Sequence, residues 1–157
     1  MSFRDQSWSG RFASLGDQAE GEFMQWARRQ EMKVERLGWD RPAMGVKRMS
    51  LHLRHLPDFY ASDGHLYEVV GMGRDGVLKG VKTEKWDSLR FWNSVQPVRL
   101  FVFNSSKNAT VLLAWPTLVQ LVAKARRDGI QAFANDGNTY YPIQWAWLEP
   151  YSVGESG

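Results

Sequence analysis

Two acidic residues ten positions apart, Asp58 and Glu68, have the types and spacing needed to bind a metal ion together. Side chains that lie directly opposite each other in an antiparallel hairpin have Cβ atoms roughly 4.5–5.5 Å apart. Two carboxylates at that distance repel each other unless a cation lies between them, and hard cations such as Mg²⁺ and Mn²⁺ prefer oxygen ligands. The pair therefore predicts a divalent-metal site, provided that a hairpin brings the two residues together.

The residues between these acids favour such a hairpin, because apolar and polar residues alternate on both sides of a turn cluster at residues 62–64. The strand-like stretches are residues 51–54, 59–60 and 66–70. A three-residue loop, with Gly64 in the left-handed conformation, places Asp58 opposite Glu68. A two-residue turn at Asp63 and Gly64 would instead put the acids on opposite faces. The bland alternative is that Asp58 follows a strand-ending proline and that Glu68 is a solvated edge residue.

The composition limits the number of domains and the kinds of chemistry. The 157 residues suffice for one domain with its own core. The absence of cysteine excludes disulfides, thiolate metal sites and cysteine nucleophiles, and it suits a reducing compartment. A formal net charge of +3 permits a polyanionic partner. No stretch approaches the ~20 apolar residues of a membrane span and the N-terminus does not resemble a secretory signal, so we expect a soluble, cytoplasmic protein without membrane contact.

Aromatic residues and histidines leave several interpretations open. The chain has eight Trp, eight Phe and five Tyr, enough for part of the aromatic surface to serve a partner instead of the core. Trp39, Trp86 and Trp92 fit either a core or a stacking surface. The histidines His52, His55 and His65 lie in strand-like surroundings without the helical pairing of a zinc site, so we interpret them as incidental.

Hydrophobic periodicity indicates the elements that must position the acids. We expect a loose arm at 1–13, a helix at 14–30, strands at 32–37, 77–81, 97–103 and 110–115, helices at 83–93 and 116–128, short strands at 140–143 and 145–148, and a disordered tail at 151–157. A helix between two strands suggests a crossover connection. Glu20 lies at the edge of the apolar stripe of the first helix, so it either points toward whatever the helix covers or is an ordinary surface glutamate.

The order helix, three strands, helix, strand resembles the PD-(D/E)xK nuclease superfamily. The residues that carry this resemblance are Gly16 and Glu20 on the first helix, Pro57-Asp58-Phe59 at the second strand and Glu68 on the third. Restriction endonucleases, archaeal Holliday-junction resolvases, phage recombination nucleases and the nuclease subunit of Tn7-like transposons belong to it.

The resemblance covers residues 14–103 and implies an α/β fold with a restriction-endonuclease-like αβββαβ core. In that fold a mixed central sheet is flanked by helices, and residues 104–150 would be a C-terminal addition within a single domain. The resemblance also implies Mg²⁺ (or Mn²⁺) bound by Asp58, Glu68 and the carbonyl of Val69, with Glu20 as an auxiliary acid.

One position departs from the family pattern, because Val70 stands where the superfamily has a lysine two residues after the second acid. That lysine orients the attacking water and offsets charge in the transition state. If residues 77–81 fold back on the third strand, an even-numbered loop brings Lys79 opposite Val70, and a three-residue loop brings Lys82 opposite Glu68. If the fourth strand occupies that edge, a lysine at the start of the second helix is the better donor, and Lys85 also follows closely. We predict that Lys82 and Lys79 together replace the lysine that is missing at Val70.

The predicted function is that of a metal-dependent DNA endonuclease in recombination, repair, transposition or phage DNA processing. Basic residues that could seat the DNA backbone are Arg28, Arg29, Lys47, Arg48 and Arg54. The chain could act as a homodimer or cut only within a larger recombination or transposition complex. The alternative is a catalytically inactive nuclease-fold module that binds DNA or a protein.

Overall fold

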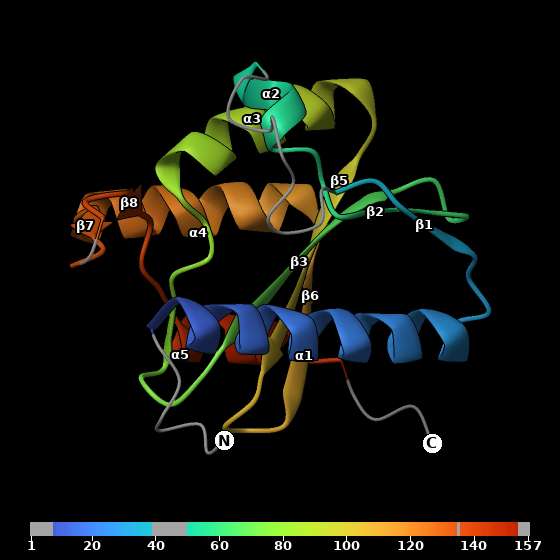
Figure 1. The fold of residues 1–157 in the computed structure, drawn as a ribbon, viewed down its shortest axis with the longest axis horizontal. Helices are drawn as coiled ribbons and strands as arrows, with labels where there is room; N and C mark the ends of the chain where they lie inside the picture. Colours follow the sequence, from blue (N-terminus) through green and yellow to red (C-terminus); the bar gives the residue numbers. More distant parts are fainter. Residues whose placement is uncertain (1–7, 39–49, 135, 154–157) are drawn as a thin grey trace.

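A mixed five-stranded sheet with helices on both faces forms the centre of the protein (Figure 1). The computed structural model describes residues 8–38, 50–134 and 136–153. In spatial order the strands are β1 (Val34–Arg36), β2 (Phe59–Ala61), β3 (Leu66–Met72), β5 (Val98–Asn104) and β6 (Ala109–Leu113). The predicted α/β class with a mixed central sheet is confirmed.

The directions of the strands follow from their connections. Strands β1, β2 and β3 are antiparallel neighbours, β5 is parallel to β3, and β6 is antiparallel to β5. The step from β3 to β5 runs through helix α3 (Thr83–Val95), as a parallel pair requires a crossover. The predicted crossover is therefore confirmed.

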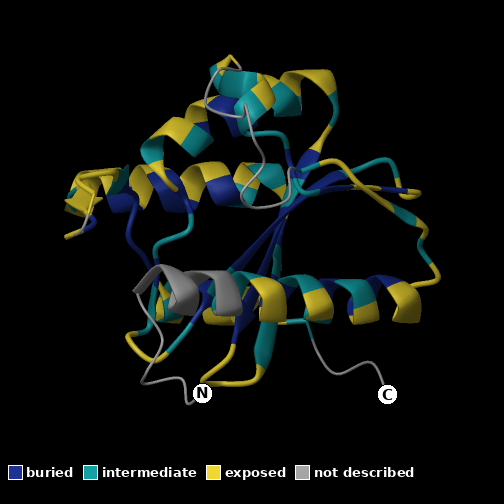
Figure 2. Ribbon diagram, in the orientation of Figure 1, coloured by how far each residue is buried: buried dark blue, intermediate teal, exposed yellow. Residues whose placement is uncertain are grey.

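Each face of the sheet has its own apolar cluster, and Figure 2 shows the buried strands between the helices. Helix α1 (Trp8–Arg29) covers one face, where Phe23 packs against the rings of Tyr67 and Phe101. Helices α3 and α4 (Trp115–Asp128) lie on the other face (Figure 1). Because side chains alternate along a strand, Tyr67 faces α1, whereas Glu68 faces α3.

The C-terminal part adds two small sheets and two short helices. Strand β4 (Val77–Leu78) pairs with β9 (Ile143–Gln144), and β7 (Gln131–Ala132) pairs with β8 (Thr139–Tyr140). Helix α5 (Trp145–Leu148) and the 3₁₀ helix η3 (Glu149–Tyr151) follow. No helix within the described ranges is long and apolar enough to cross a membrane.

Several predicted boundaries are wrong. The segment predicted as a strand at 51–54 is a short helix, α2 (Leu51–Arg54), which packs against α3. Residues 145–148 are helical as well, and α1 already begins within the expected arm. Tertiary contacts override short alternating patterns of this kind. Part of the expected tail is ordered, because Ser152 forms a β-bridge with Val111; residues 154–157 lie outside the described residues.

Gly71 on β3 allows α1 to approach the sheet closely, and this contact can be tested. A Cβ at Gly71 would lie 2.5 Å from the carbonyl oxygen of Leu15, whereas a Cβ at Gly21 would meet nothing within 4 Å. We expect Gly71→Ala to lower the free energy of unfolding by about 1–3 kcal/mol through overpacking. Gly21→Ala, on the same helix–sheet layer, should raise it by up to about 1 kcal/mol. Urea unfolding measures both, and equal stability of the two variants would contradict this packing.

Candidate active site

The hairpin of β2 and β3 places Asp58 opposite Glu68. Phe59 pairs with Tyr67 and Tyr60 with Leu66, so the next step of the same register joins positions 58 and 68. The connecting loop has three residues and ends at Gly64, which has a φ of 86°. The predicted three-residue loop is therefore confirmed, and the two-residue turn is excluded.

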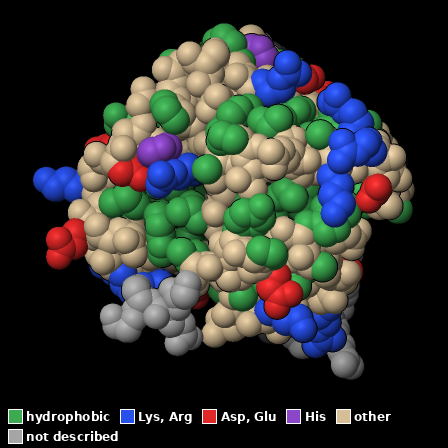
Figure 3. Space-filling view, turned by 180° about the vertical axis from the view of Figure 1, so that it is seen from behind, with side chains coloured by type: hydrophobic (Ala, Val, Ile, Leu, Met, Phe, Trp, Pro, Cys, Tyr) green, Lys and Arg blue, Asp and Glu red, His purple; other side chains and the backbone are tan. Residues whose placement is uncertain are grey.

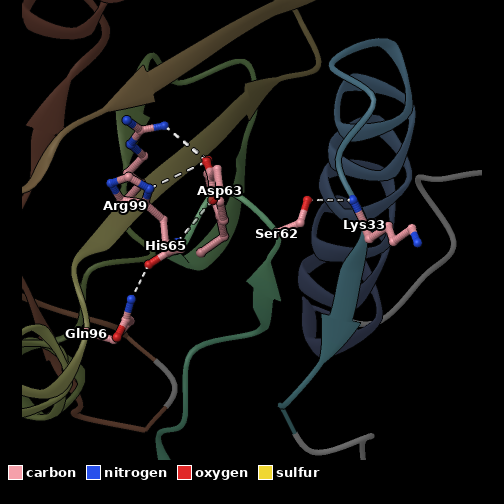
Figure 4. A network of polar contacts seen from close by, with 8 residues as sticks. Lys33, Ser62, Asp63, His65, Gln96 and Arg99 are labelled. Atoms are coloured by element: carbon pink, nitrogen blue, oxygen red, sulfur yellow. Dashed lines mark hydrogen bonds and ion pairs between the residues drawn. The ribbon is translucent and has the colours of Figure 1, made fainter.

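A network of polar contacts holds this loop (Figure 4). The Tyr67 hydroxyl donates to Asp63 Oδ2 at 2.5 Å, and Arg99 Nη1 donates to the Tyr67 oxygen at 3.2 Å. Burial, followed by the hydrogen bond to Asp63, raises the pKa of Tyr67, so this hydroxyl keeps its proton. Burial disfavours the charge of Asp63, but the hydrogen bonds from Tyr67 and from the backbone of His65 outweigh it and lower the pKa of Asp63.

The loop is also tied to its neighbours on both sides. Ser62 Oγ accepts a hydrogen bond from the backbone N–H of Lys33, just before β1, at 3.0 Å. The side-chain amide of Gln96, just after α3, donates to the Gly64 carbonyl. The loop is thereby connected to both neighbouring elements (Figure 4).

The Asp58 carboxylate is oriented by the backbone around it. The Val69 N–H donates to Asp58 Oδ2 at 2.8 Å, and the N–H groups of Leu37 and Gly38 donate to the Asp58 carbonyl at 2.8 and 3.2 Å. A Cβ at Gly38 would lie 3.2 Å from Oδ1, so the glycine leaves room beside that oxygen. Asp58 is therefore fixed through one oxygen.

Glu68 is a buried acid beside a lysine. Its side chain is 1% exposed, and Lys85 Nζ lies 2.6 Å from Oε1. The oxygen Oε2 is buried and has no hydrogen-bond partner among the described residues. Burial, followed by the negative charge of Asp58, raises the pKa of Glu68 well above 4.5, and Lys85 opposes this shift. The protein thus keeps two carboxyls together at a position where their joint ionisation is unfavourable.

The lysine that reaches Glu68 is Lys85, in the first turn of α3, and the predicted placement of Lys79 and Lys82 is wrong. Lys79 forms an ion pair with Asp75 at 2.8 Å. Lys82 precedes α3 as its N-cap, and its Nζ lies 5.6 Å from the centre of a phenylalanine ring in the C-terminal part. The reason is the sheet topology: β5 occupies the edge of β3, and β4 pairs with β9 instead.

Glu20 lies on the α1 side of the sheet. Its carboxylate binds the guanidinium of Arg36 on β1 at 2.8 Å, and that guanidinium also lies 4.9 Å from the Phe59 ring centre. Glu68 faces α3, on the other side. The described contacts therefore place Glu20 with Arg36 and not with the acid pair, and a role as auxiliary acid stays a prediction.

The basic residues predicted to seat DNA are distributed over the molecule. Arg28 and Arg29 are exposed in the last turn of α1, away from the acid pair in the fold. Arg54 lies at the end of α2, where it pairs with Glu84 of α3 at 3.7 Å. Lys47 and Arg48 lie outside the described residues. Figure 3 shows Lys and Arg side chains in a row along one edge of the molecule.

His55 belongs to the surroundings of the site, which the sequence interpretation missed. Burial, followed by the positive charges of Lys85 and Arg54, lowers the pKa of His55, and its Nδ1 is buried without a hydrogen-bond partner in the described part of the chain. His55 caps the C-terminal end of α2, so the strand-like surroundings expected for His52 and His55 are wrong. The signal in the sequence that could have placed His55 near the site was its position three residues before Asp58.

The donor set fits a hard divalent cation. Two carboxyls face each other, Glu68 has an unpartnered buried oxygen, and a divalent cation would remove the conflict between burial and ionisation. Among the described residues, no group of three or more His, Asp or Glu side chains could hold a metal ion, so a main-chain ligand, as predicted for the Val69 carbonyl, would have to complete the protein's contribution. The remaining positions would be filled by water or substrate oxygens, as is usual for Mg²⁺.

No protein-family model matches the chain, and no curated protein matches it either. The function is therefore inferred from the residues and their geometry alone.

The raised pKa of Glu68 predicts how stability depends on pH without metal. As pH rises above 4.5, the unfolded chain loses the Glu68 proton while the folded chain retains it, so increasing pH favours unfolding. We expect the wild type to lose stability relative to Glu68→Gln as the pH rises above 4.5, because the glutamine has no proton to lose. Urea unfolding in EDTA measures the difference. Gln25→Ala, at an exposed position of α1, should follow the wild type because it changes no titratable group. Parallel curves for Glu68→Gln and wild type would contradict the raised pKa of Glu68.

Proposed function

We propose that this chain is a metal-dependent deoxyribonuclease that hydrolyses phosphodiester bonds on a restriction-endonuclease-like core. The observation that carries the proposal is the acid pair, with the half-buried Asp58 opposite the buried Glu68 and Lys85 Nζ 2.6 Å from Glu68. The element order supports it, because α1, the antiparallel strands β1–β3, the crossover helix α3 and the parallel strand β5 occur in the order that the resemblance implies, with α2 and β4 inserted between them.

Each residue of the acid pair has a defined task in this proposal. Asp58 and Glu68 would hold Mg²⁺ or Mn²⁺, with the Val69 carbonyl as a further ligand. A bound cation of this kind polarises the phosphate and lowers the pKa of a bound water. Asp58 is already oriented by the Val69 N–H, so its carboxylate would bind the cation without reorganisation of the loop.

Lys85 takes the place of the lysine that is missing at Val70. Its ammonium would bind a non-bridging phosphate oxygen or the attacking water and offset the negative charge of the transition state. The lysine is partly exposed, at 21% of its side chain, so it can contact both the buried Glu68 and a substrate. Within this proposal the partner is DNA, and a second copy of the chain would supply the second acid pair needed to cut two strands.

A titration with Mn²⁺ tests the metal site. We expect calorimetry to show one binding event for the wild type that Asp58→Asn abolishes, because half of the carboxylate ligands is lost. Glu20→Gln is the control. It should leave the Mn²⁺ affinity within about twofold, because Glu20 is paired with Arg36 and not with the acid pair. Absence of Mn²⁺ binding by the folded wild type would contradict the proposal.

Cleavage of labelled DNA tests the lysine. We expect Lys85→Ala to retain Mn²⁺ binding and to lower the cleavage rate by about 100-fold or more, the usual effect of removing a group that stabilises transition-state charge. Lys79→Ala is the matched control, since that lysine pairs with Asp75, and it should cleave as the wild type does. If Lys79→Ala is impaired and Lys85→Ala is not, the assignment of Lys85 is wrong.

A second candidate function is an inactive nuclease-fold module that binds DNA or protein. The direct Lys85–Glu68 contact favours it, because the ammonium neutralises part of the buried charge without any metal. A chain that binds DNA but neither binds Mn²⁺ nor cuts linear, branched or single-stranded DNA would support this module and not the enzyme.

A further inference from the structure

An aromatic pair, which we call the His52–Phe91 stack, lies at the surface between α2 and α3. The two rings are nearly parallel, with centroids 4.5 Å apart and an interplanar angle of 7°. Phe91 is 43% exposed and belongs to neither apolar cluster of the described core. The core therefore does not account for the aromatic ring at this position.

Two hydrogen bonds from residues of α3 hold His52 of the stack in place. The buried Ser88 places its Oγ 3.1 Å from His52 Nδ1, and the indole N–H of Trp92 donates to the His52 carbonyl at 3.0 Å. These contacts fix the imidazole ring before any ligand arrives. A preorganised aromatic surface binds with a smaller loss of conformational entropy than a mobile one.

The stack lies close to the proposed active site along both elements that carry it. Phe91 follows Lys85 by six residues of α3, about 9 Å along the helix axis. The other ring of the stack is linked more directly, because His52 contacts Ser88, which lies one turn after Lys85 on the same side of α3. His52 precedes Asp58 by six residues, through the end of α2.

A positive charge, Arg54, lies between His52 and Asp58 in the sequence. Arg54 ends α2, and its guanidinium is 3.7 Å from Glu84, whose side chain is 63% exposed. An exposed ion pair of this length contributes little, so a phosphate can replace Glu84 as the partner of Arg54. The surface thus offers an aromatic ring and a cation, the two kinds of group that sites for single-stranded nucleic acids combine.

We propose that the His52–Phe91 stack binds an unpaired base of the strand whose phosphate lies at Asp58 and Glu68, so that the substrate class is single-stranded or locally unpaired DNA. This inference rests on the proposed nuclease function. A base in an intact duplex is already stacked on both faces and does not reach a ring on the protein surface. Because every base has a π-face, the contact selects unpaired strands and not a sequence.

Fluorescence anisotropy with a labelled oligothymidine and a blunt duplex of equal length, in EDTA, tests the inference. We expect the wild type to bind the single strand more tightly. Phe91→Ala should weaken single-strand binding by about 5- to 150-fold, the equivalent of roughly 1–3 kcal/mol of stacking, and leave duplex binding unchanged. Phe91→Trp should retain the preference. Val119→Ala is the control, since Val119 is similarly exposed, at 39%, on α4.

Three results would overturn the inference: unchanged single-strand binding by folded Phe91→Ala, an equal loss for the single strand and the duplex, or tighter binding of oligouridine than of oligothymidine. Thermal unfolding shows whether each variant is folded. Because the measurement is made without metal, failure of the base-binding surface is distinguishable from failure of the proposed function, which the Mn²⁺ titration of Asp58→Asn reports separately.

Discussion

The candidate site depends on the register between β2 and β3. A slip of one residue would turn the side chain at position 58 to the α1 face, and the two acids would no longer meet. The loop prevents this slip through Gly64, which has a positive φ, and through the hydrogen bonds among Asp63, Tyr67 and Arg99. Because Arg99 lies on β5, the network joins the hairpin to the parallel part of the sheet.

The cost of burying Glu68 is the second constraint on the site. An acid that is buried next to another acid is stable only with a proton, a cation or both. Lys85 supplies one positive charge, and Gly38, which has no side chain, leaves room beside Asp58 Oδ1. Such local instability is common where a protein is organised for a ligand instead of for maximum stability.

The sequence was sufficient where local chemistry decides the structure. The turn residues at 62–64 predicted the loop, and thus the meeting of Asp58 and Glu68, and periodicity predicted α1, α3 and the buried strand β5. The sequence was insufficient where contacts between segments far apart in the chain decide the structure. The partner of β4 is β9, more than sixty residues later, so no local pattern could show that Lys79 turns away from Glu68. The short helix α2 likewise depends on its packing against α3, and the same contacts place His55 beside Lys85.

The acids of the site lie on β3 and directly before β2, whereas the ammonium comes from a helix. Strand pairing and the position of the lysine are therefore determined by different elements. An insertion before α3, or a substitution one turn along it, can move the charge while both carboxyls remain in place. A sequence search that requires the lysine at a fixed offset from the second acid will consequently overlook chains whose lysine comes from a helix. Comparing the three-dimensional positions of charged groups around the two carboxyls is the appropriate way to find such chains.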